Sequence, residues 1–325
     1  MSSKSFEMVA IGGVGGSGTG VVAQLVKDVG FYLGSDLNSA NDNLSFTLLF
    51  KRPRWFRRNV DRREVIFQGL DIFSRAMTGN TLLLADFGFI SSAVADMAVR
   101  GQDHFKNGRG LWPFVRARKM IRPKKLDYSS VAGWGWKEPN THIYLEYLRS
   151  HFEDLRYIHI MRNGLDMAYS GNQAQLFNWG PLFGVKIPDA RELIPRAALS
   201  YWVKANQKAI AIGKELGEKK FLLVNFDKLC ATPKPEVDRL LSFMRTDNEK
   251  IDRLRLYNLF KTPESSGRYR QHDLTVLDKK DIEAVSDFGF SVGHQKSSKK
   301  TNQDTPLRII PENQESNLDT VPPMR

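Results

Sequence analysis

Residues 6–34 read FEMVAIGGVGGSGTGVVAQLVKDVGFYLG, and this stretch decides the fold. Residues 8–11 form an apolar run that is short enough for a buried parallel strand. Six glycines then crowd residues 12–20, and apolar residues recur every four positions over residues 21–29, as on one helix face. Backbone N–H groups at the start of such a helix bind anions, and glycines let phosphate oxygens approach because they have no Cβ. The stretch therefore predicts a strand, a phosphate-binding turn and a helix.

This turn meets two common nucleotide-binding patterns only in part. Residues 13–18 have the glycine spacing of a P-loop, but Thr19 stands where that motif has its lysine and Gly20 where it has the metal-binding hydroxyl. The same glycines fit the dinucleotide-binding pattern G-x-G-x-x-G, and Asp36 follows at about the distance of a ribose-binding acid. A nucleotide-dependent kinase and a nicotinamide oxidoreductase are therefore alternatives that the rest of the chain must decide.

The composition is that of a basic chain with an ordinary hydrophobic core. The 325 residues are 41% hydrophobic, enough for one large domain or two modest ones. The single cysteine, Cys230, excludes an internal disulfide and favours a reducing, cytoplasmic location. Much of the formal charge of +12 lies in residues 51–63 and 116–125, which suits a highly anionic cofactor, an acidic glycan or simply a solvated surface. No nucleic-acid-binding signature accompanies these clusters, so no nucleic acid is expected as a partner.

Strand and helix patterns alternate along the rest of the chain. Strands are expected at residues 31–33, 81–85, 131–136, 157–161 and 221–224. Helices are expected at residues 65–77, 91–99, 142–152, 191–216 and 235–244, with another from about residue 165. Residues 101–123 are expected to be irregular and residues 226–232 a loop. The alternation predicts an α/β fold, a P-loop-like parallel sheet flanked by helices on both faces.

The chain ends in a polar, lysine- and asparagine-rich segment that is nearly free of aromatic residues. Such a composition does not support a packed core, so a single α/β domain is expected over residues 1–293 and a disordered tail over residues 294–325. No transmembrane segment is expected, because the longest apolar stretch, residues 81–99, contains two aspartates.

Polar groups directly follow several of the expected strands. They are the glycine turn, Asp36, Lys137 with Glu138, and Arg162. Ligands of parallel sheets bind beyond the carboxyl ends of the strands, so these groups should meet in one crevice. Arg162 ends a strand and Ser170 is expected two turns into the next helix, so the two could grip one phosphate. Arg162 could instead form a salt bridge with Asp166.

Taken in order, these motifs resemble the sulfotransferase family, and among its members they are most similar to the tyrosylprotein and glycan branches. The match runs over residues 8–271. Gly-Gly-Ser-Gly-Thr at residues 15–19 resembles the loop that wraps the 5′-phosphosulfate of the family's donor. Arg162 and Ser170 resemble the family's pair for the 3′-phosphate, and residues 226–233 resemble its common late loop.

Two further motifs resemble the catalytic groups of the tyrosylprotein branch. Lys137-x-Pro-x-Thr resembles a lysine motif that contacts the transferring sulfuryl group. Residues 34–36, Gly-Ser-Asp, resemble a Gly-Glu-Glu segment whose second acid is the general base, which implies Asp36 as the base. Read from the residues alone, Asp36 could instead form a turn with its own backbone, and Lys137 could be an exposed lysine at a strand end.

The resemblance implies transfer of a sulfuryl group from 3′-phosphoadenosine-5′-phosphosulfate to a hydroxyl, leaving adenosine 3′,5′-bisphosphate. The acceptor stays open between a glycan, a lipid, a peptide and a small alcohol, with a carbohydrate as one candidate. The implied donor-binding residues are Gly15, Gly16, Ser17, Gly18, Thr19, Gly20, Arg162 and Ser170. No metal is required in principle for such an in-line transfer. Lesser candidates for the base are Glu138, Asp42 and His104.

The glycine turn departs from the family at one position. Most family loops carry a basic residue just before the serine, whereas this chain has Gly16 before Ser17. Lys137, alone or with an arginine from residues 51–63, would then have to offset the charge of the leaving group. A polyanion-binding module without catalysis remains a third alternative, although it would not need Lys137 and Asp36 at strand ends.

Overall fold

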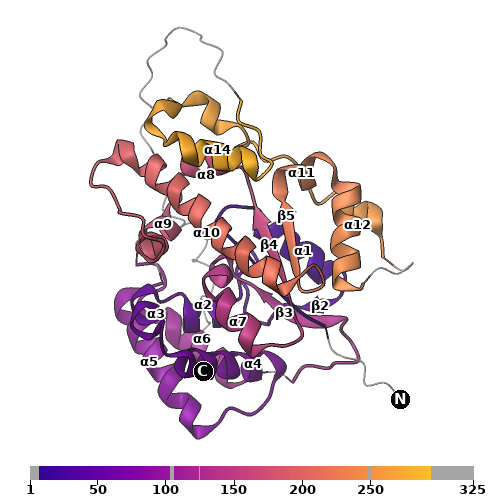
Figure 1. Cartoon of the computed structure of the whole chain (residues 1–325). Coiled ribbons are helices and arrows are strands. Elements are labelled where there is room, and N and C mark those ends of the chain that lie inside the picture. Colours follow the sequence, from indigo (N-terminus) through magenta and orange to yellow (C-terminus); the bar gives the residue numbers. More distant parts are fainter. Residues whose placement is uncertain (1–6, 103–105, 124, 247–250, 294–325) are drawn as a thin grey trace, which may run out of the picture.

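The computed structural model describes residues 7–102, 106–123, 125–246 and 251–293 (Figure 1). Its centre is a parallel sheet with the strand order β2-β3-β1-β4-β5. The strands are β1 (Glu7–Gly13), β2 (Phe31–Tyr32), β3 (Gly133–Lys137), β4 (Leu155–Met161) and β5 (Phe221–Asn225). The sheet confirms the predicted α/β fold. The strand predicted at residues 8–11 is found as β1, and four of the five other predicted strands lie close to their expected places.

Helices cover both faces of the sheet. The α-helices before β4 are α1 (Thr19–Asp28), α2 (Leu44–Phe50), α3 (Pro53–Asn59), α4 (Arg63–Thr78), α5 (Leu84–Arg100), α6 (Trp112–Ile121) and α7 (Leu145–His151). Those after β4 are α8 (Gly164–Ala168), α9 (Ala174–Trp179), α10 (Ile194–Leu216), α11 (Phe226–Ala231), α12 (Pro233–Met244), α13 (Arg253–Tyr257) and α14 (Lys279–Asp287). Short 3-10 turns are η1 (Pro139–Tyr144), η2 (Gly180–Phe183), η3 (Arg191–Leu193), η4 (Arg268–Gln271) and η5 (Leu274–Val276).

The hydrophobic core lies on both sides of the sheet because side chains alternate along each strand. In β1, Ala10 packs into a large cluster with side chains of α2 to α10, whereas Val9 and Ile11 pack into a smaller one with α1, α11 and α12. All three β1 side chains are fully buried. A strand buried on both faces needs a continuous apolar run, and this is the run that the sequence shows at residues 8–11.

Three local predictions were wrong. Residues 81–85 are not a strand, because the Asp86 carboxylate accepts a hydrogen bond from the Leu83 N–H at 2.7 Å and starts α5 at residue 84. Residues 101–123 are not irregular throughout, since α6 forms within them and buries Pro113, Ala117 and Met120 along one side. Residues 226–232 are not a loop, because the Asn225 side chain caps a short helix, α11. In each case a cap or a helical spacing decided the local structure.

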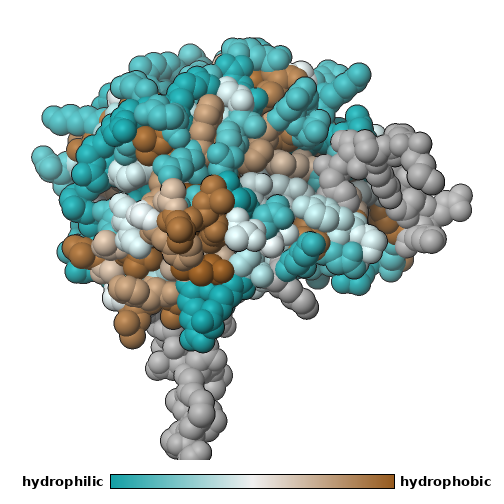
Figure 2. All heavy atoms as spheres, turned by 90° about the horizontal axis from the view of Figure 1, so that it is seen from below, coloured by the Kyte–Doolittle hydropathy of each residue, from teal (hydrophilic) through white to brown (hydrophobic). Residues whose placement is uncertain are grey.

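Apolar side chains are exposed mainly on the α5–α6 pair. Figure 2 shows a patch of apolar surface on the face seen from below. Among the described residues, eight of the thirteen exposed large apolar side chains lie in this pair or at its ends: Leu83, Leu84, Phe87, Val99, Leu111, Phe114, Val115 and Ile121. Apolar patches of this kind mark contacts with partners or substrates. No helix of the described residues is long and apolar enough to span a membrane. The tail predicted over residues 294–325 lies outside the described residues.

Candidate active site

The carboxyl ends of the parallel strands bring the predicted groups to one edge of the sheet. Lys137, the last residue of β3, pairs with Ile11 of β1, and Gly13, the last residue of β1, pairs with Ile160 of β4. Arg162 follows β4 directly. The glycine turn, Lys137 and Arg162 therefore surround the same edge, where ligands of parallel α/β sheets bind.

The glycine turn is held in a conformation that needs glycine. Gly18 caps α1 with a φ of 89°, and a Cβ at this position would lie 2.3 Å from the Phe226 ring. The turn buries Ser17 completely, and the Ser17 Oγ has no hydrogen-bond partner among the described residues. The turn thus presents a hydroxyl and the N-terminal end of α1, both of which suit an anion.

The missing cation at Gly16 has a structural reason. Gly16 has a φ of 86°, a left-handed conformation that disfavours side chains. A Cβ here would also lie 3.1 Å from the Met167 Cε. A lysine or arginine at Gly16 would therefore strain the backbone of the turn and displace the end of the Met167 side chain.

Gln175 contacts the glycine turn, although no sequence pattern predicted this contact. The Gly15 N–H donates to the Gln175 Oε1 at 3.0 Å, and the Tyr201 hydroxyl donates to the same oxygen at 3.3 Å. The Gln175 Nε2 is buried and lacks a partner in the part of the chain that the structure describes. The Gln175 side chain thus accepts the Gly15 N–H through its oxygen, and its Nε2 is an unused donor beside the turn.

Lys137 is buried rather than exposed. Its Nζ donates to the Ala40 carbonyl at 3.0 Å and forms an ion pair with Asp42. The Ala40 carbonyl lies against the first turn of α1, since a Cβ at Gly20 would come within 2.9 Å of its oxygen. The Lys137 ammonium is therefore held next to the start of α1.

Asp36 is also buried, and it pairs with α6 rather than forming a turn with its own side chain. The Arg116 Nη1 lies 2.6 Å and the Lys119 Nζ 2.7 Å from the Asp36 Oδ1. The Asp36 Oδ2 has no partner among the described side chains and backbone. One carboxylate oxygen is thus fixed by two cations, and the other is unpaired within the described residues. Arg116 and Lys119 were not predicted as partners of Asp36, although their spacing of three fits one helix face.

Glu138, next to Lys137 at this edge, is a buried carboxyl group with a strongly shifted pKa. Burial raises its pKa from 4.5 to about 7, while the charge of Lys51 and hydrogen bonds from Asn140 act in the opposite direction. The Asn140 backbone N–H and side-chain amide donate to the two Glu138 oxygens at 2.7 and 2.8 Å. A carboxyl with a pKa near 7 can exchange a proton at neutral pH.

Replacing Glu138 by glutamine is expected to remove a pH dependence of stability between pH 4.5 and about 7. In this range the unfolded chain has released the proton, whereas the folded protein keeps it because the Glu138 pKa is raised to about 7. The free energy of unfolding therefore falls as pH rises, by about 1.4 kcal/mol per pH unit from this group. Thermal unfolding at several pH values measures this pH dependence. It is compared between the wild type, Glu138→Gln and the control Glu218→Gln, which changes an exposed glutamate. A gap between wild type and Glu138→Gln that stays constant with pH would contradict the expectation.

Arg162 is buried and does not pair with Asp166. Its Nη2 donates to the Ser265 hydroxyl at 2.8 Å, and its Nε has no partner among the described residues. Asp166 instead accepts hydrogen bonds from the backbone N–H groups of Gly267 and Tyr269, at 2.8 and 3.3 Å. The Arg162 guanidinium therefore forms no ion pair with a carboxylate within the described residues.

Ser170 lies just past α8 instead of two turns into a helix. The helix ends at Ala168, where the Gln173 side chain donates to the carbonyls of Met167, Ala168 and Ser170 at 2.9, 3.1 and 2.9 Å. Arg162 and Ser170 thus flank the single short helix α8. His104, a lesser candidate for the base, lies outside the described residues. Within them, no three histidine, cysteine or carboxylate side chains are grouped as metal ligands.

Comparison with known proteins identifies the class of this enzyme. A sequence model of the sulfotransferase family matches residues 10–249, so the chain belongs to the sulfotransferase family and is a transferase. No curated protein sequence matches it. The kinase and oxidoreductase alternatives receive no support.

The chain is also similar to solved structures of several other proteins. STF1 from Mycobacterium tuberculosis H37Rv is 14% identical with a TM-score of 0.44, covering 87% of this chain and 77% of its own. STF9 from Mycobacterium avium is 13% identical with a TM-score of 0.44, covering 89% and 78%. The sulfotransferase domain of the Synechococcus PCC 7002 olefin synthase is 14% identical with a TM-score of 0.41, covering 88% and 95%.

Proposed function

We propose that this sulfotransferase moves a sulfuryl group from 3′-phosphoadenosine-5′-phosphosulfate to a hydroxyl acceptor. One observation carries the proposal. Three buried polar atoms on and around the strand ends lack partners among the described residues: Ser17 Oγ, Gln175 Nε2 and Arg162 Nε. Buried polar groups are nearly always hydrogen-bonded, so a set of unused donors at one edge calls for a ligand rich in acceptor oxygens. A phosphosulfate donor with a 3′-phosphate has that chemistry.

The donor would be bound at both ends. The N–H groups and hydroxyls of residues 15–20 would hold its 5′-phosphosulfate at the start of α1. Arg162 and Ser170 would hold its 3′-phosphate from the two ends of α8, the arginine by a charged fork and the serine by its hydroxyl. Gln175 would release the Gly15 N–H to the phosphosulfate and turn its amide nitrogen toward it.

The transfer itself would need two groups of this chain. The acceptor oxygen forms a bond to sulfur while the bond from sulfur to the 5′-phosphate oxygen breaks, and the acceptor proton passes to a base. Lys137 would meet the negative charge that grows on the departing phosphate oxygen, because its ammonium has three donors and uses two, on Ala40 and Asp42. Asp36 would take the proton through its free Oδ2, with Glu138 as the competing base.

Calorimetric titration tests the donor assignment before an acceptor is known. Adenosine 3′,5′-bisphosphate should bind at least about tenfold more tightly than NAD or ATP, because only the bisphosphate offers phosphates to both the glycine turn and Arg162. Tighter binding of NAD would instead favour a nicotinamide oxidoreductase, and tighter binding of ATP would favour a kinase. Release of labelled sulfate to water then reports turnover without an acceptor.

Gln175→Glu is expected to weaken donor binding about tenfold or more. The carboxylate keeps the size of the amide and its acceptor for the Gly15 N–H, but it replaces the donor at Nε2 by a negative charge facing the phosphosulfate. The matched control is Asn172→Asp, which adds the same charge at an exposed position three residues earlier. Titration of the donor into both variants measures the effect. Equal affinities for the two variants would exclude Gln175 from the donor site.

A further inference from the structure

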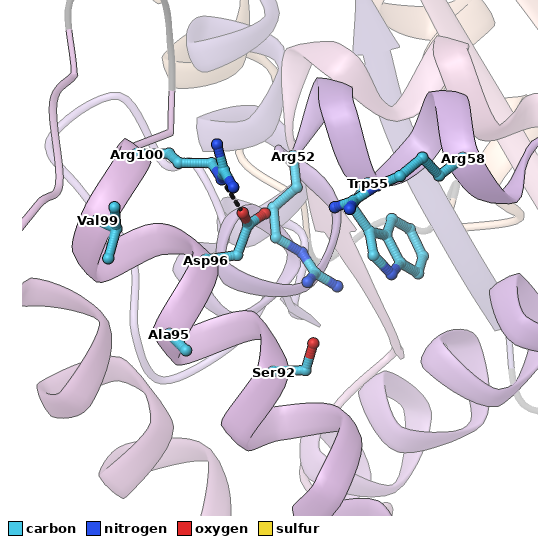
Figure 3. A pocket seen from close by; sticks show the side chains of 8 residues that line it. All are labelled: Arg52, Trp55, Arg58, Ser92, Ala95, Asp96, Val99 and Arg100. Carbon is cyan, nitrogen blue, oxygen red and sulfur yellow. Dashed lines mark hydrogen bonds and ion pairs between the residues drawn. The ribbon is translucent and has the colours of Figure 1, made fainter.

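A second cluster of polar groups surrounds a cavity away from the sheet edge. The cavity has a volume of about 290 Å³ and lies between α3 and α5 (Figure 3). Its lining residues are Arg52, Trp55, Arg58, Ser92, Ala95, Asp96, Val99 and Arg100. Two of the arginines belong to the basic residues 51–63, which the proposed sulfuryl transfer does not use.

Arg52 is the unusual member of this lining. The residue is only 2% exposed, and its guanidinium lies over the Trp55 ring at 4.4 Å from the centroid. The Nε donates to the Leu49 carbonyl at 2.9 Å, but neither terminal nitrogen, Nη1 or Nη2, has a partner in the part of the chain that the structure describes. Burial lowers the Arg52 pKa to about 10, which still leaves the group charged at neutral pH.

The one acid of the lining does not satisfy Arg52. Asp96 pairs with Arg100, whose Nε lies 2.7 Å from the Asp96 Oδ1, and Figure 3 shows this pair beside the Arg52 guanidinium. Three arginines and one aspartate leave the cavity with a net charge of +2. A buried guanidinium with free N–H groups is unfavourable unless an anion pairs with it, and the fork of two nitrogens suits two oxygens of one oxyanion.

We propose that this cavity is a second anion site, which binds the carboxylate or sulfate group of a small molecule through Arg52, with Arg58 and Arg100 at its rim. Ser92 adds a hydroxyl, and Trp55, Ala95 and Val99 give apolar surface to the body of an organic anion. The same oxyanion chemistry fits an acidic group carried by an organic molecule, such as a sugar acid, and free inorganic sulfate. The site stands on its own residues and does not depend on the proposed sulfuryl transfer.

Titration calorimetry at constant ionic strength tests the site with three probes: glucuronate, acetate and inorganic sulfate. The variants are Arg52→Met, which keeps an apolar stem against Trp55, and Arg58→Gln on the exposed rim. The matched control is Arg62→Gln, which removes the same charge from an exposed side chain of the same segment. An anion that binds at the glycine turn binds in the wild type and in all three variants alike. Only differences in binding between these proteins therefore report on the cavity.

We expect at least one probe to lose a binding event in Arg52→Met and to bind about threefold or more weakly in Arg58→Gln, with Arg62→Gln like wild type. Glucuronate binding more tightly than acetate and sulfate identifies an organic acid as the occupant, and sulfate binding most tightly identifies the inorganic ion. If none of the probes binds, or if Arg62→Gln loses as much as Arg52→Met, the proposal is overturned. Should Arg52→Met fail to fold, unchanged binding in Arg58→Gln overturns it equally.

Discussion

Replacing Lys137 by alanine is expected to slow sulfuryl transfer about 100-fold or more, while the affinity for adenosine 3′,5′-bisphosphate changes little. The loss falls on turnover because Lys137 would act on charge that grows only as the bond to the 5′-phosphate oxygen breaks. No side chain of the glycine turn can replace it, since Gly16 has a left-handed backbone that disfavours a lysine. The buried Lys137 ammonium is instead fixed beside α1 by Ala40 and Asp42.

Single-turnover release of labelled sulfate measures this effect in folded variants whose melting temperatures are compared first. Lys137→Arg should restore little activity, because a planar guanidinium does not fit the place of a compact ammonium between Ala40 and Asp42. Lys234→Ala, at an exposed lysine, is the control. Normal turnover of Lys137→Ala would show that the leaving-group cation comes from elsewhere, and the basic residues 51–63 would then be the place to search.

Arg162→Ala is expected to weaken bisphosphate binding by roughly 2–3 kcal/mol, a loss of about 30- to 150-fold. The structure leaves the buried Arg162 without a carboxylate partner among the described residues, so its charge is available to a phosphate. Ser170→Ala removes a neutral hydroxyl and should cost only about 1 kcal/mol. Titration calorimetry of the folded variants measures both losses.

A comparison of two ligands separates a lost phosphate contact from general damage. Adenosine 5′-monophosphate lacks the 3′-phosphate, so Arg162→Ala should leave its affinity close to that of wild type. Arg191→Ala, which removes an exposed arginine, should change neither affinity. An equal loss for both ligands would mean that Arg162 supports the fold rather than the 3′-phosphate, and unchanged affinities would remove the assignment.

The glycine turn and the strand ends were predictable because they depend on short-range patterns. The apolar run at residues 8–11 can be buried on both faces only as a central strand, and the glycines after it permit the left-handed backbone at Gly16 and Gly18. Lys137 and Arg162 each end or directly follow an apolar run. Parallel pairing then brings such residues to one edge without further information.

The partners of these residues were not predictable, because they come from distant segments. Gln175 reaches Gly15 across 160 positions, and no local pattern sets it apart from other glutamines. The cations on Asp36 belong to α6, whose apolar side is narrow and interrupted by basic residues, so that the segment looked irregular. The early end of α8 before Ser170 depends on the Gln173 side chain, a capping contact that propensities do not encode.

Incubation of the protein with 3′-phosphoadenosine-5′-phosphosulfate carrying a labelled sulfate tests sulfuryl transfer most directly. Water can act as a slow acceptor, so the wild-type protein should release labelled sulfate and adenosine 3′,5′-bisphosphate in equal amounts, faster than buffer alone. The Lys137→Ala protein should bind the bisphosphate like wild type and release about 100-fold less sulfate. Release from the wild type that does not exceed the buffer rate, although the donor is bound, would contradict sulfuryl transfer from this donor.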